Sequence, residues 1–368
     1  MIELGLDDVQ RRQYFETLRR DHRMRVLLTL LDPGEKYIGA IDGRITSGQV
    51  VGDAAQKIPT SAQLAMEVSR LPRPPRRGDM IRIRREVLTP FGWYGPPLFH
   101  GPVDKATLDD TTLSLDLLDK NSLLMQETRS VHLYRKGLTR VGVIRDIAYD
   151  RGERRFDLPE WPNAKLAAPL QIRPGKQPWS YMLIQARSMR TQLFYNGAGA
   201  LRLRRHPTGT SLWFSQDDGV VLTPPKTVES DADLINAVKV IGKPPAGKKW
   251  KIEAKAYIPP WHRLSPEKLA RAGGDSKTYR WEVIEDETIR TKKDAQAAAD
   301  RRVKELLAQT GGVTFTALPH PGIELGDVEY INAGSVQVPY RLSSYSIPLV
   351  AEEPMTIGYV RPLRRSKK

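Results

Sequence analysis

The sequence predicts an α+β fold in which strands predominate, and three observations lead to this prediction. Residues 24–126 contain several short apolar runs separated by Pro and Gly, which is typical of an antiparallel sandwich or barrel. Helical periodicity returns between about 141 and 205, and a capped helix at 292–309 lies between two strand-like stretches. The 368 residues are enough to build more than one domain.

The first element expected along the chain is a short amphipathic helix at 7–22. Its inner face is expected to carry Val9, Tyr14, Phe15 and Leu18. From Met24 the pattern changes to strands, and Asp32-Pro33-Gly34 supplies the first turn. The strands predicted in this part are 25–31, 39–45, 65–69, 79–85, 98–103 and 112–119. Apolar and basic residues alternate in 79–85, which indicates one buried and one exposed face.

Helices and a hairpin follow. One helix is predicted around 143–148, and a second begins at Gln177-Pro178, where Pro suits the first turn. The second helix has an apolar stripe, which we interpret as core: Trp179, Met182, Leu183, Ala186 and Met189. Residues 193–203 predict a hairpin with Asn196-Gly197 as its turn. Further strands are predicted at 211–214, 219–222 and 234–242.

Residues 243–285 are rich in Pro and Lys and contain one predicted strand, 279–283. A stretch of this length is too long for a bare connection in a compact domain. We therefore expect it to carry structure or to contact a partner.

The helix at 292–309 is the best-defined element of the sequence. Thr291 is placed to cap its first turn, with Asp294 able to return a hydrogen bond, and Gly311-Gly312 is expected to end it. Its apolar face consists of Ala295, Ala299, Val303, Leu306 and Leu307. The remaining predicted strands are 313–316, 325–331, 340–349 and 355–360.

Composition limits the classes of function. The chain has no cysteine, which excludes disulfides, a thiolate nucleophile and cysteine-based metal sites. Its N-terminus is acidic, without the pattern of a signal peptide, and no apolar run is long enough for a membrane span. We expect a protein that is kept soluble or that leaves the cell by a route other than secretion.

The net charge of +15 occurs in small scattered groups, which favours a basic assembly surface over a dedicated nucleic-acid site.

No catalytic centre is predicted. The histidines are far apart in the sequence, without the paired spacing of a zinc protease: His22, His100, His132, His206, His262 and His320. Gly197-Ala198-Gly199 is better explained by the hairpin than by a dinucleotide loop. The adjacent carboxylates Asp217-Asp218 and Glu352-Glu353 should point to opposite faces of a strand. We therefore predict no enzyme activity, no catalytic, cofactor-binding or metal-binding residues, and no cofactor.

Several blocks of the sequence, taken in their order, resemble phage tail hub proteins, which form a trimer at the distal end of the tail tube. The blocks are Arg77–Ile83, Val143–Ala148 with Gly152–Pro159, Gln177–Leu203, Leu234–Gly242, Thr288–Asp300 and Pro321–Val328.

The resemblance implies two antiparallel β-barrel or sandwich domains, the second discontinuous, with an inserted α/β domain. On this basis we expect an N-terminal segment at 1–23, a first, tube-facing barrel at 24–126 and an intervening α/β domain at 127–205 plus 243–287. The second barrel is expected at 206–242 plus 288–360, followed by a basic tail at 361–368.

The resemblance also implies a function in assembly. Three subunits would together present six barrels to a hexameric tail tube. The same trimer would offer threefold symmetry to the proteins of the tip, and it would surround a channel through which DNA leaves. The implied partners are the chain itself, the tube protein, the distal tail protein ring, the tape measure protein, tip fibre or receptor-binding proteins and, transiently, genomic DNA. The implied location is the distal tail tip of a virion assembled in the host cytoplasm, and the lysin fused to some hubs is expected on another protein. Two alternatives remain open, a cell-wall-degrading tail enzyme and a basic nucleic-acid-binding protein.

Overall fold

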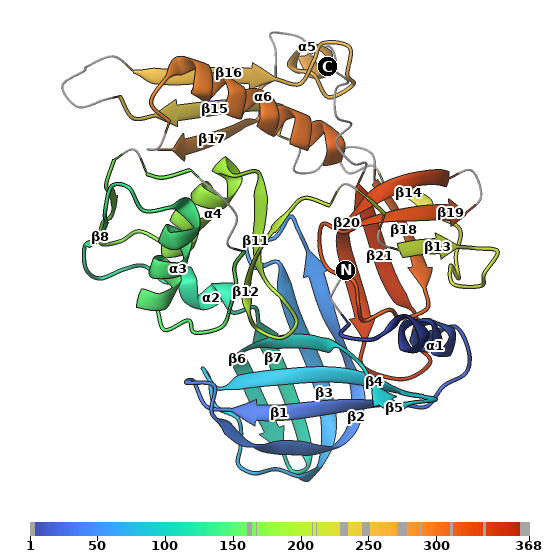
Figure 1. Ribbon diagram of the computed structural model, residues 1–368. Helices are drawn as coiled ribbons and strands as arrows, with labels where there is room; N and C mark the ends of the chain where they lie inside the picture. Colours follow the sequence, from blue (N-terminus) through green and yellow to red (C-terminus); the bar gives the residue numbers. More distant parts are fainter. Residues whose placement is uncertain are drawn as a thin grey trace. The chain divides into compact units, whose positions relative to one another are not determined.

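The computed structural model of the chain (Figure 1) describes residues 4–159, 164–166, 168–207, 209–210, 212–228, 235–244, 251–270, 278–286, 289–309, 312–333 and 336–360. The chain divides into two compact units. The first contains Met1–Pro225 and Phe315–Gly358, and the second contains Lys226–Thr314 and Tyr359–Lys368. Strands predominate among the described elements, so the predicted mainly β, α+β class is confirmed.

The first unit begins with helix α1 (Asp8–Leu18), capped by Asp7 as a capping box with Gln10. A closed antiparallel barrel follows, called the first β module. Its strands are β1 (Met24–Leu31), β2 (Tyr37–Asp53), β3 (Thr60–Arg70), β4 (Met80–Thr89), β6 (Pro97–Asp109) and β7 (Thr112–Leu118), with the short β5 (Gly92–Tyr94) paired to β4. The order is β1-β4-β6-β7-β3-β2, and pairing of β1 with β2 closes it. Inward-facing Leu30, Ile81, Ile83 and Leu113 are fully buried.

A second β module repeats this order. It contains β13 (Leu212–Ser215), β18 (Gly312–Ala317), β19 (Val328–Ala333), β20 (Val336–Pro348) and β21 (Met355–Val360) in the order β13-β19-β20-β21-β18. The first residues of β18 belong to the second unit, where they pair with β14 (Lys226–Val228). The second module therefore has the same strand order as the first. Its order, β13-β19-β20-β21-β18-β14, matches β1-β4-β6-β7-β3-β2 strand for strand. One difference is that β13 runs parallel to β19, whereas β1 runs antiparallel to β4.

Two long strands connect the β modules. The end of β2, from Gln49 to Asp53, pairs antiparallel with Ser344–Pro348 of β20. The preceding part of β2 pairs with β1 and β3 inside the first barrel. Because β2 belongs to both modules, they share one continuous run of backbone hydrogen bonds in the first unit.

A mixed segment lies between the modules in sequence and is coloured green in Figure 1. Its elements are α2 (Asn121–Leu124), β8 (His132–Tyr134), α3 (Arg140–Asp150), β9 (Phe156–Asp157), β10 (Leu170–Ile172), α4 (Pro178–Ser188), β11 (Thr191–Tyr195) and β12 (Leu201–Arg205). Helices α3 and α4 pack around a core that includes Ile144, Ile147, Trp179 and Met182. The predicted helix at 178 and the hairpin at 193–203 are both present, with Asn196 in the loop.

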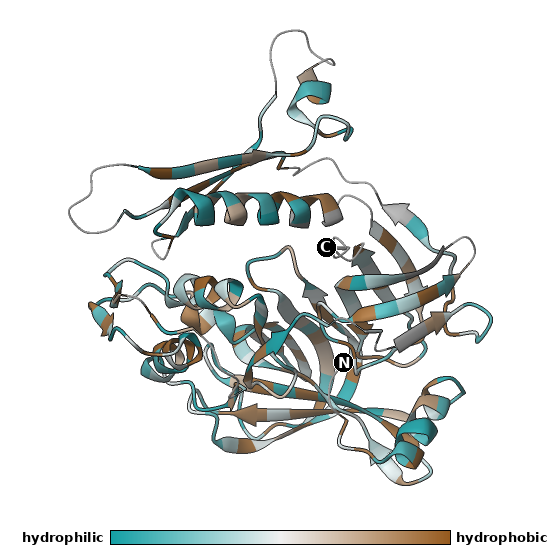
Figure 2. Ribbon diagram, turned by 45° about the horizontal axis from the view of Figure 1, so that its top comes forward, coloured by the Kyte–Doolittle hydropathy of each residue, from teal (hydrophilic) through white to brown (hydrophobic). Residues whose placement is uncertain are grey.

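The second unit has a three-stranded sheet with one helix packed on it. The sheet order is β16 (Ile252–Tyr257), β15 (Ala237–Gly242) and β17 (Trp281–Asp286), and the helices are α5 (Pro266–Ala270) and α6 (Lys292–Gln309). Hydrophobic and hydrophilic residues alternate along α6 in Figure 2, and its predicted face, including Ala295, Ala299 and Val303, is buried against Val238 and Val240 of the sheet. At its start the Thr291 hydroxyl accepts the Asp294 N–H at 3.1 Å and donates to the Asp294 carboxylate at 2.7 Å.

The expected boundaries differ from this grouping. We expected 243–287 to join the domain at 127–205, and 292–309 to join the second barrel. Instead β15, β16, β17 and α6 share one core, separate from the core of the mixed segment. The physical reason is that the apolar face of α6 must be buried, and the strands nearest to it in sequence provide the sheet that buries it.

Three smaller expectations need correction or cannot be compared. Val9 was expected inside, but it is 66% exposed on α1. Residues 219–222 form no strand, and only Val221 makes an isolated bridge, to Ala317. The expected stop at Gly311 lies outside the described residues.

Candidate functional site: the paired β modules

Each β module contains a Gly-Asp turn immediately before a strand, and the two turns have the same geometry. Gly78 and Gly326 adopt φ values of +89° and +85°, in the left-handed region that favours glycine. Asp79 and Asp327 follow them and lead into β4 and β19. The residues that come next share one burial pattern, with the first, second and fourth buried and the third half-buried.

The backbone hydrogen bonds around the first turn define its shape. The Asp79 N–H donates to the Arg76 carbonyl at 3.0 Å, and the Arg76 N–H donates to the Asp79 carboxylate at 2.7 Å. The neighbouring strand completes the turn through Val103. Its carbonyl accepts the Gly78 N–H at 3.0 Å, and its N–H donates to the Asp79 carbonyl at 2.8 Å.

The second turn repeats each of these bonds. The Asp327 N–H donates to the Glu324 carbonyl at 3.0 Å, and the Glu324 N–H donates to the Asp327 carboxylate at 2.9 Å. Leu342 of β20 takes the place of Val103. It accepts from Gly326 and donates to the Asp327 carbonyl, both at 2.8 Å. The two modules therefore agree in local hydrogen bonding as well as in strand order.

A buried carboxylate paired with arginine stabilises each turn. Asp79, 3% exposed, accepts two hydrogen bonds from Arg73 at 2.6 and 2.8 Å. Although burial acts to raise the pKa of Asp79, the hydrogen bonds from Arg73 and the Arg76 N–H outweigh it and lower that pKa. Asp327 is fully buried and accepts a hydrogen bond from Arg204 at 2.8 Å.

In the second turn the arginine comes from the mixed segment. Arg204 of β12 also contacts the Glu324 carboxylate at 3.0 Å and donates to the Leu325 carbonyl at 2.6 Å. Arg202, two residues earlier on the same face of β12, pairs with Glu324 at 3.2 Å and with Asp157 at 3.0 Å. This arginine pair fixes the hairpin of the mixed segment to the second β module.

A second buried ionic cluster fixes the mixed segment to the first β module. Lys120, 3% exposed at the end of β7, contacts Glu153 at 2.8 Å, donates to the Gly199 carbonyl at 3.0 Å and also pairs with Glu35. Glu35 accepts from Arg155 at 2.9 Å. The Glu153 carboxylate is held in turn by the N–H groups of Arg154 and Arg155, at 2.8 and 2.7 Å.

The buried His100 borders this cluster and is neutral. Burial lowers the pKa of His100 to about 3, and the positive charges of Lys120, Arg82 and Arg155 act in the same direction. Its Nε2 lies 3.5 Å from the Glu35 carboxylate. His100 therefore adds no positive charge to the cluster, in which Lys120 and Arg155 pair with Glu35 and Glu153.

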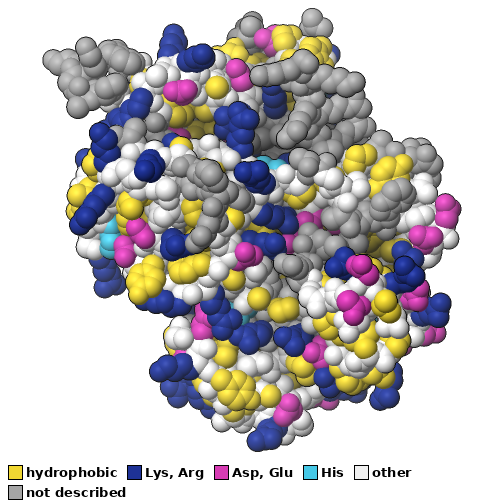
Figure 3. All heavy atoms as spheres, in the orientation of Figure 1, with side chains coloured by type: hydrophobic (Ala, Val, Ile, Leu, Met, Phe, Trp, Pro, Cys, Tyr) yellow, Lys and Arg dark blue, Asp and Glu magenta, His cyan; other side chains and the backbone are white. Residues whose placement is uncertain are grey.

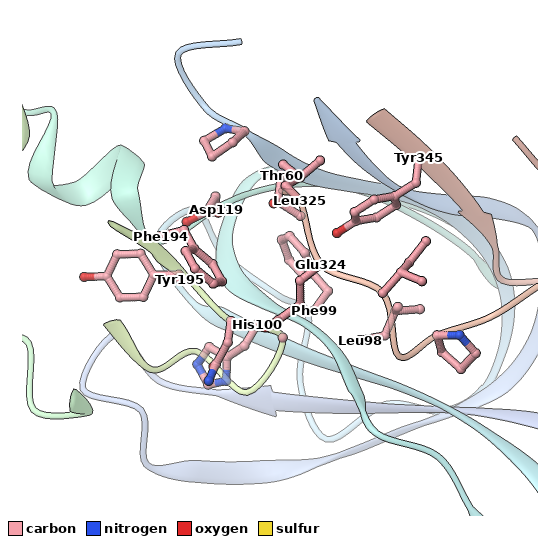
Figure 4. A pocket seen from close by; sticks show the side chains of 15 residues that line it. Thr60, Leu98, Phe99, His100, Asp119, Phe194, Tyr195, Glu324, Leu325 and Tyr345 are labelled. Atoms are coloured by element: carbon pink, nitrogen blue, oxygen red, sulfur yellow. The ribbon is translucent and has the colours of Figure 1, made fainter. Parts of the chain in front are cut away.

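A small cavity, lined mainly by apolar atoms, lies where the modules and the mixed segment meet (Figure 4). Asp119, Thr60 and Tyr345 line it, and its volume is about 40 Å³. Burial raises the pKa of Asp119 to about 7 despite hydrogen bonds from the Asn121 N–H and Thr60, and burial likewise raises the pKa of Tyr345. This volume is far smaller than that of substrate pockets, which are typically roughly 300–1,000 Å³.

The residues considered for chemistry are not brought together. Among the described residues, no group of three or more His, Asp or Glu side chains is arranged to hold a metal ion. His100 is buried, whereas His320 is half-buried and stacks on Phe15. Burial lowers the pKa of His320 to about 4. Gly199 lies in the hairpin loop, as predicted. No described helix has the length and apolar character of a membrane span.

Positive charge is dispersed on the surface. Lys and Arg side chains are spread over the visible face in Figure 3, with Asp and Glu among them, and do not form one patch.

The two buried ionic clusters were not predicted from the sequence, because their members are far apart in the chain. The repeated Gly-Asp pair was visible in the sequence and could have revealed the repeated modules.

Comparison with known proteins identifies the architecture. The sequence matches no protein-family model and no curated protein. Among solved structures, the 43 kDa tail protein of prophage MuSo2 from Shewanella oneidensis has 14% identity and a TM-score of 0.57, covering 93% of this chain and 98% of that protein. A tail protein from Neisseria meningitidis MC58 has 12% identity and a TM-score of 0.59, covering 92% and 97%.

Prophage tail protein gp18 from Listeria monocytogenes EGD-e is also similar, with 10% identity, a TM-score of 0.52 and coverage of 92% and 95%. All three alignments extend over nearly the whole of both chains, so they include both β modules and not a single shared domain. The chain therefore has the fold of phage tail proteins, and the resemblance that its sequence motifs indicated is confirmed at the level of the fold.

Proposed function

We propose that this chain is a structural protein of a phage tail and that three copies form a hub at the distal end of the tail. The observation that carries this proposal is the repetition of one β module within the chain. Strand order, the Gly-Asp turn and its hydrogen bonds occur twice. The likeness of the whole chain to tail proteins supports the same conclusion.

Because each chain contains the β module twice, a trimer would combine threefold symmetry with six similar modules. Three copies would present six similar β modules, which can occupy near-equivalent positions around one axis. Such a ring can contact a hexameric tube, while the mixed segment and the second unit, which occur once per chain, keep threefold symmetry for proteins of the tip. The proposed partners are accordingly the tube protein, the distal tail protein ring, the tape measure protein and tip fibres.

The proposed role is architectural and not enzymatic. The buried charges described above are engaged in holding the mixed segment to the two modules, and the cavity among them is of water size. The net charge of +15 gives the hub a weak, sequence-independent attraction for DNA passing through its channel.

The mass of the purified full chain in solution tests this proposal. Analytical ultracentrifugation should show a species of three times the 41.6 kDa chain mass, with a monomer–trimer equilibrium at low concentration. A dimer, or a monomer that persists at high concentration in the presence of the tube protein, would contradict the proposal.

A further inference from the structure

One edge of β6 has no partner strand in the part of the chain that the structure describes. Residues 97–102 of β6 pair with β4, and residues 103–109 pair with β7 on the opposite edge. The β4 side of residues 104–109 is left unpaired, and all of these residues except Ala106 are exposed. An unpaired edge presents backbone N–H and C=O groups to which another strand can bind. We call residues 104–109 the open edge.

The corresponding edge of the second module is filled. β20 has the place of β6 in the strand order, and Leu342 corresponds to Val103 through the hydrogen bonds of the Gly-Asp turns. Counting from this pair, Ser344–Pro348 correspond to residues 105–109. Ser344–Pro348 pair with Gln49–Asp53 of β2. The open edge of the first module therefore lacks the strand that the second module receives from β2.

Burial of the side chains shows the same difference. Ile347 of β20 lies opposite Val50 of β2, and both are fully buried. Its counterpart Leu108 is 42% exposed, although it lies opposite Leu113, which is fully buried in the first barrel. Residues that lie opposite each other in a ladder share a face of the sheet. Leu108 therefore continues the apolar face of the barrel and is uncovered where Ile347 is covered by β2.

The backbone of the open edge is oriented to accept a strand. In β20, Ser343 and Leu349 are joined to β2 by backbone hydrogen bonds of 2.8 and 2.9 Å. Backbone groups alternate in direction along a strand, so every second residue between these two also points to β2. The corresponding residues of β6 are Ala106 and Leu108. Their N–H and C=O groups point away from β7, so a strand can be added without disturbing the β6–β7 pairing.

The internal repeat identifies which strand fills the open edge. β2 is the last strand in the order of the first module, and β14 is the last strand in the order of the second. β14 pairs with β18 on one side, and no described strand pairs with its other side. The free side of β14 and the open edge of β6 are thus the counterparts of two edges, on β2 and β20, that are joined within the chain.

We propose that β14 of one copy pairs antiparallel with residues 105–109 of β6 in a second copy of this chain. This inference rests on the proposed threefold hub and specifies the contact between its subunits. The contact repeats between copies the β2–β20 junction that exists within each copy. Three internal and three external junctions then close a ring of six modules. Backbone hydrogen bonds across the added strand supply the affinity, and Leu108 becomes buried.

The variant Leu108→Lys tests whether the open edge is covered in the trimer. A lysine is tolerated at an edge that stays in water but opposes the addition of a strand. Analytical ultracentrifugation of the full chain should show that the concentration for half-dissociation of the trimer rises roughly tenfold or more. Leu88→Lys is the matched control, because Leu88 is 37% exposed on β4 and that strand is paired on both sides, with β1 and β5. The control should assemble like the wild type.

A second variant changes the backbone and not the charge. Ala106→Pro removes an N–H group that points to the open edge, and proline is tolerated where the N–H faces away from the existing ladder. We expect the trimer to be weakened as by Leu108→Lys. Circular dichroism and thermal unfolding should show a folded chain for both variants, so that the loss of mass reports on the junction.

Cross-linking tests whether β14 is the strand that fills the edge. Lys105 in the open edge and Lys226 in β14 are both exposed. Unlabelled and isotope-labelled chains are mixed, assembled and treated with a lysine-reactive cross-linker. Mass spectrometry of the trimer should find Lys105 joined to Lys226 with one peptide from each isotope, which proves a link between copies.

The possible outcomes separate this inference from the proposed function. A wild type that forms no trimer contradicts the hub itself and the junction with it. A trimer that withstands both Leu108→Lys and Ala106→Pro overturns the junction and leaves the hub in place. A trimer that yields no mixed-isotope link between Lys105 and Lys226 overturns the assignment of β14 as the added strand.

Discussion

Replacing Asp327 with alanine is expected to destabilise the first unit by about 3 kcal/mol. The fully buried carboxylate accepts from Arg204 at 2.8 Å and from the Glu324 N–H at 2.9 Å. Its removal leaves a buried guanidinium with only Glu324 as an acidic partner, and it frees a backbone N–H from its acceptor. Both effects carry the penalty of an unsatisfied buried polar group.

Urea-induced unfolding measures this effect, and two variants calibrate it. Asp79→Ala removes the equivalent carboxylate of the first module, but the Arg73 side chain is 30% exposed and can turn to water, so a smaller loss of about 2 kcal/mol is expected. Asp42→Ala changes an exposed aspartate on β2 and should stay within about 0.5 kcal/mol of the wild type. Equal, small effects for all three would show that the turns do not depend on their carboxylates.

Replacing Lys120 with methionine is expected to cost about 3–5 kcal/mol of the same unit's stability. Methionine preserves the length of the side chain and its contact with the Tyr195 ring, which Lys120 overlies at 5.2 Å. The change removes the cation from between Glu35 and Glu153, of which Glu153 is almost fully buried. Glu35 keeps Arg155 as a partner, whereas the buried Glu153 loses the ammonium group that compensates its charge.

The double variant Lys120→Met/Glu153→Gln separates charge from packing. Neutralising Glu153 removes the uncompensated charge, so the double variant should be more stable than Lys120→Met alone. Lys105→Met, an exposed lysine on β6, is the control for the substitution itself and should have little effect. If the double variant is less stable than the single one, the cluster does not act through charge compensation.

Local elements were predictable wherever the signal lies within a few neighbouring residues. The helix at 292–309 was predicted to the residue, because its cap and its apolar period are both continuous in sequence. The strands of the first barrel were located but shortened. The predicted 39–45 is part of β2, which runs from Tyr37 to Asp53, because its second half pairs with β20, almost 300 residues later.

The grouping of elements was harder to predict, since it depends on contacts between distant residues. Nothing local to Lys120 or Arg204 shows that each is buried against carboxylates from other parts of the chain. Likewise, Tyr257 and Trp281 come from two strands, so the contact between their rings is not evident from the sequence. The Gly-Asp turns were detectable because each is a short motif, although their equivalence became clear only from matching hydrogen bonds.

We infer that the two β modules of one chain occupy equivalent positions in a threefold assembly. Electron microscopy of the assembled oligomer, alone or at the end of a tail, tests this claim most directly. We expect a ring of six β modules around one axis, alternately first and second along the ring, with overall threefold symmetry. A reconstruction in which the two modules lie at different radii, or one with an even rotational symmetry, would contradict it.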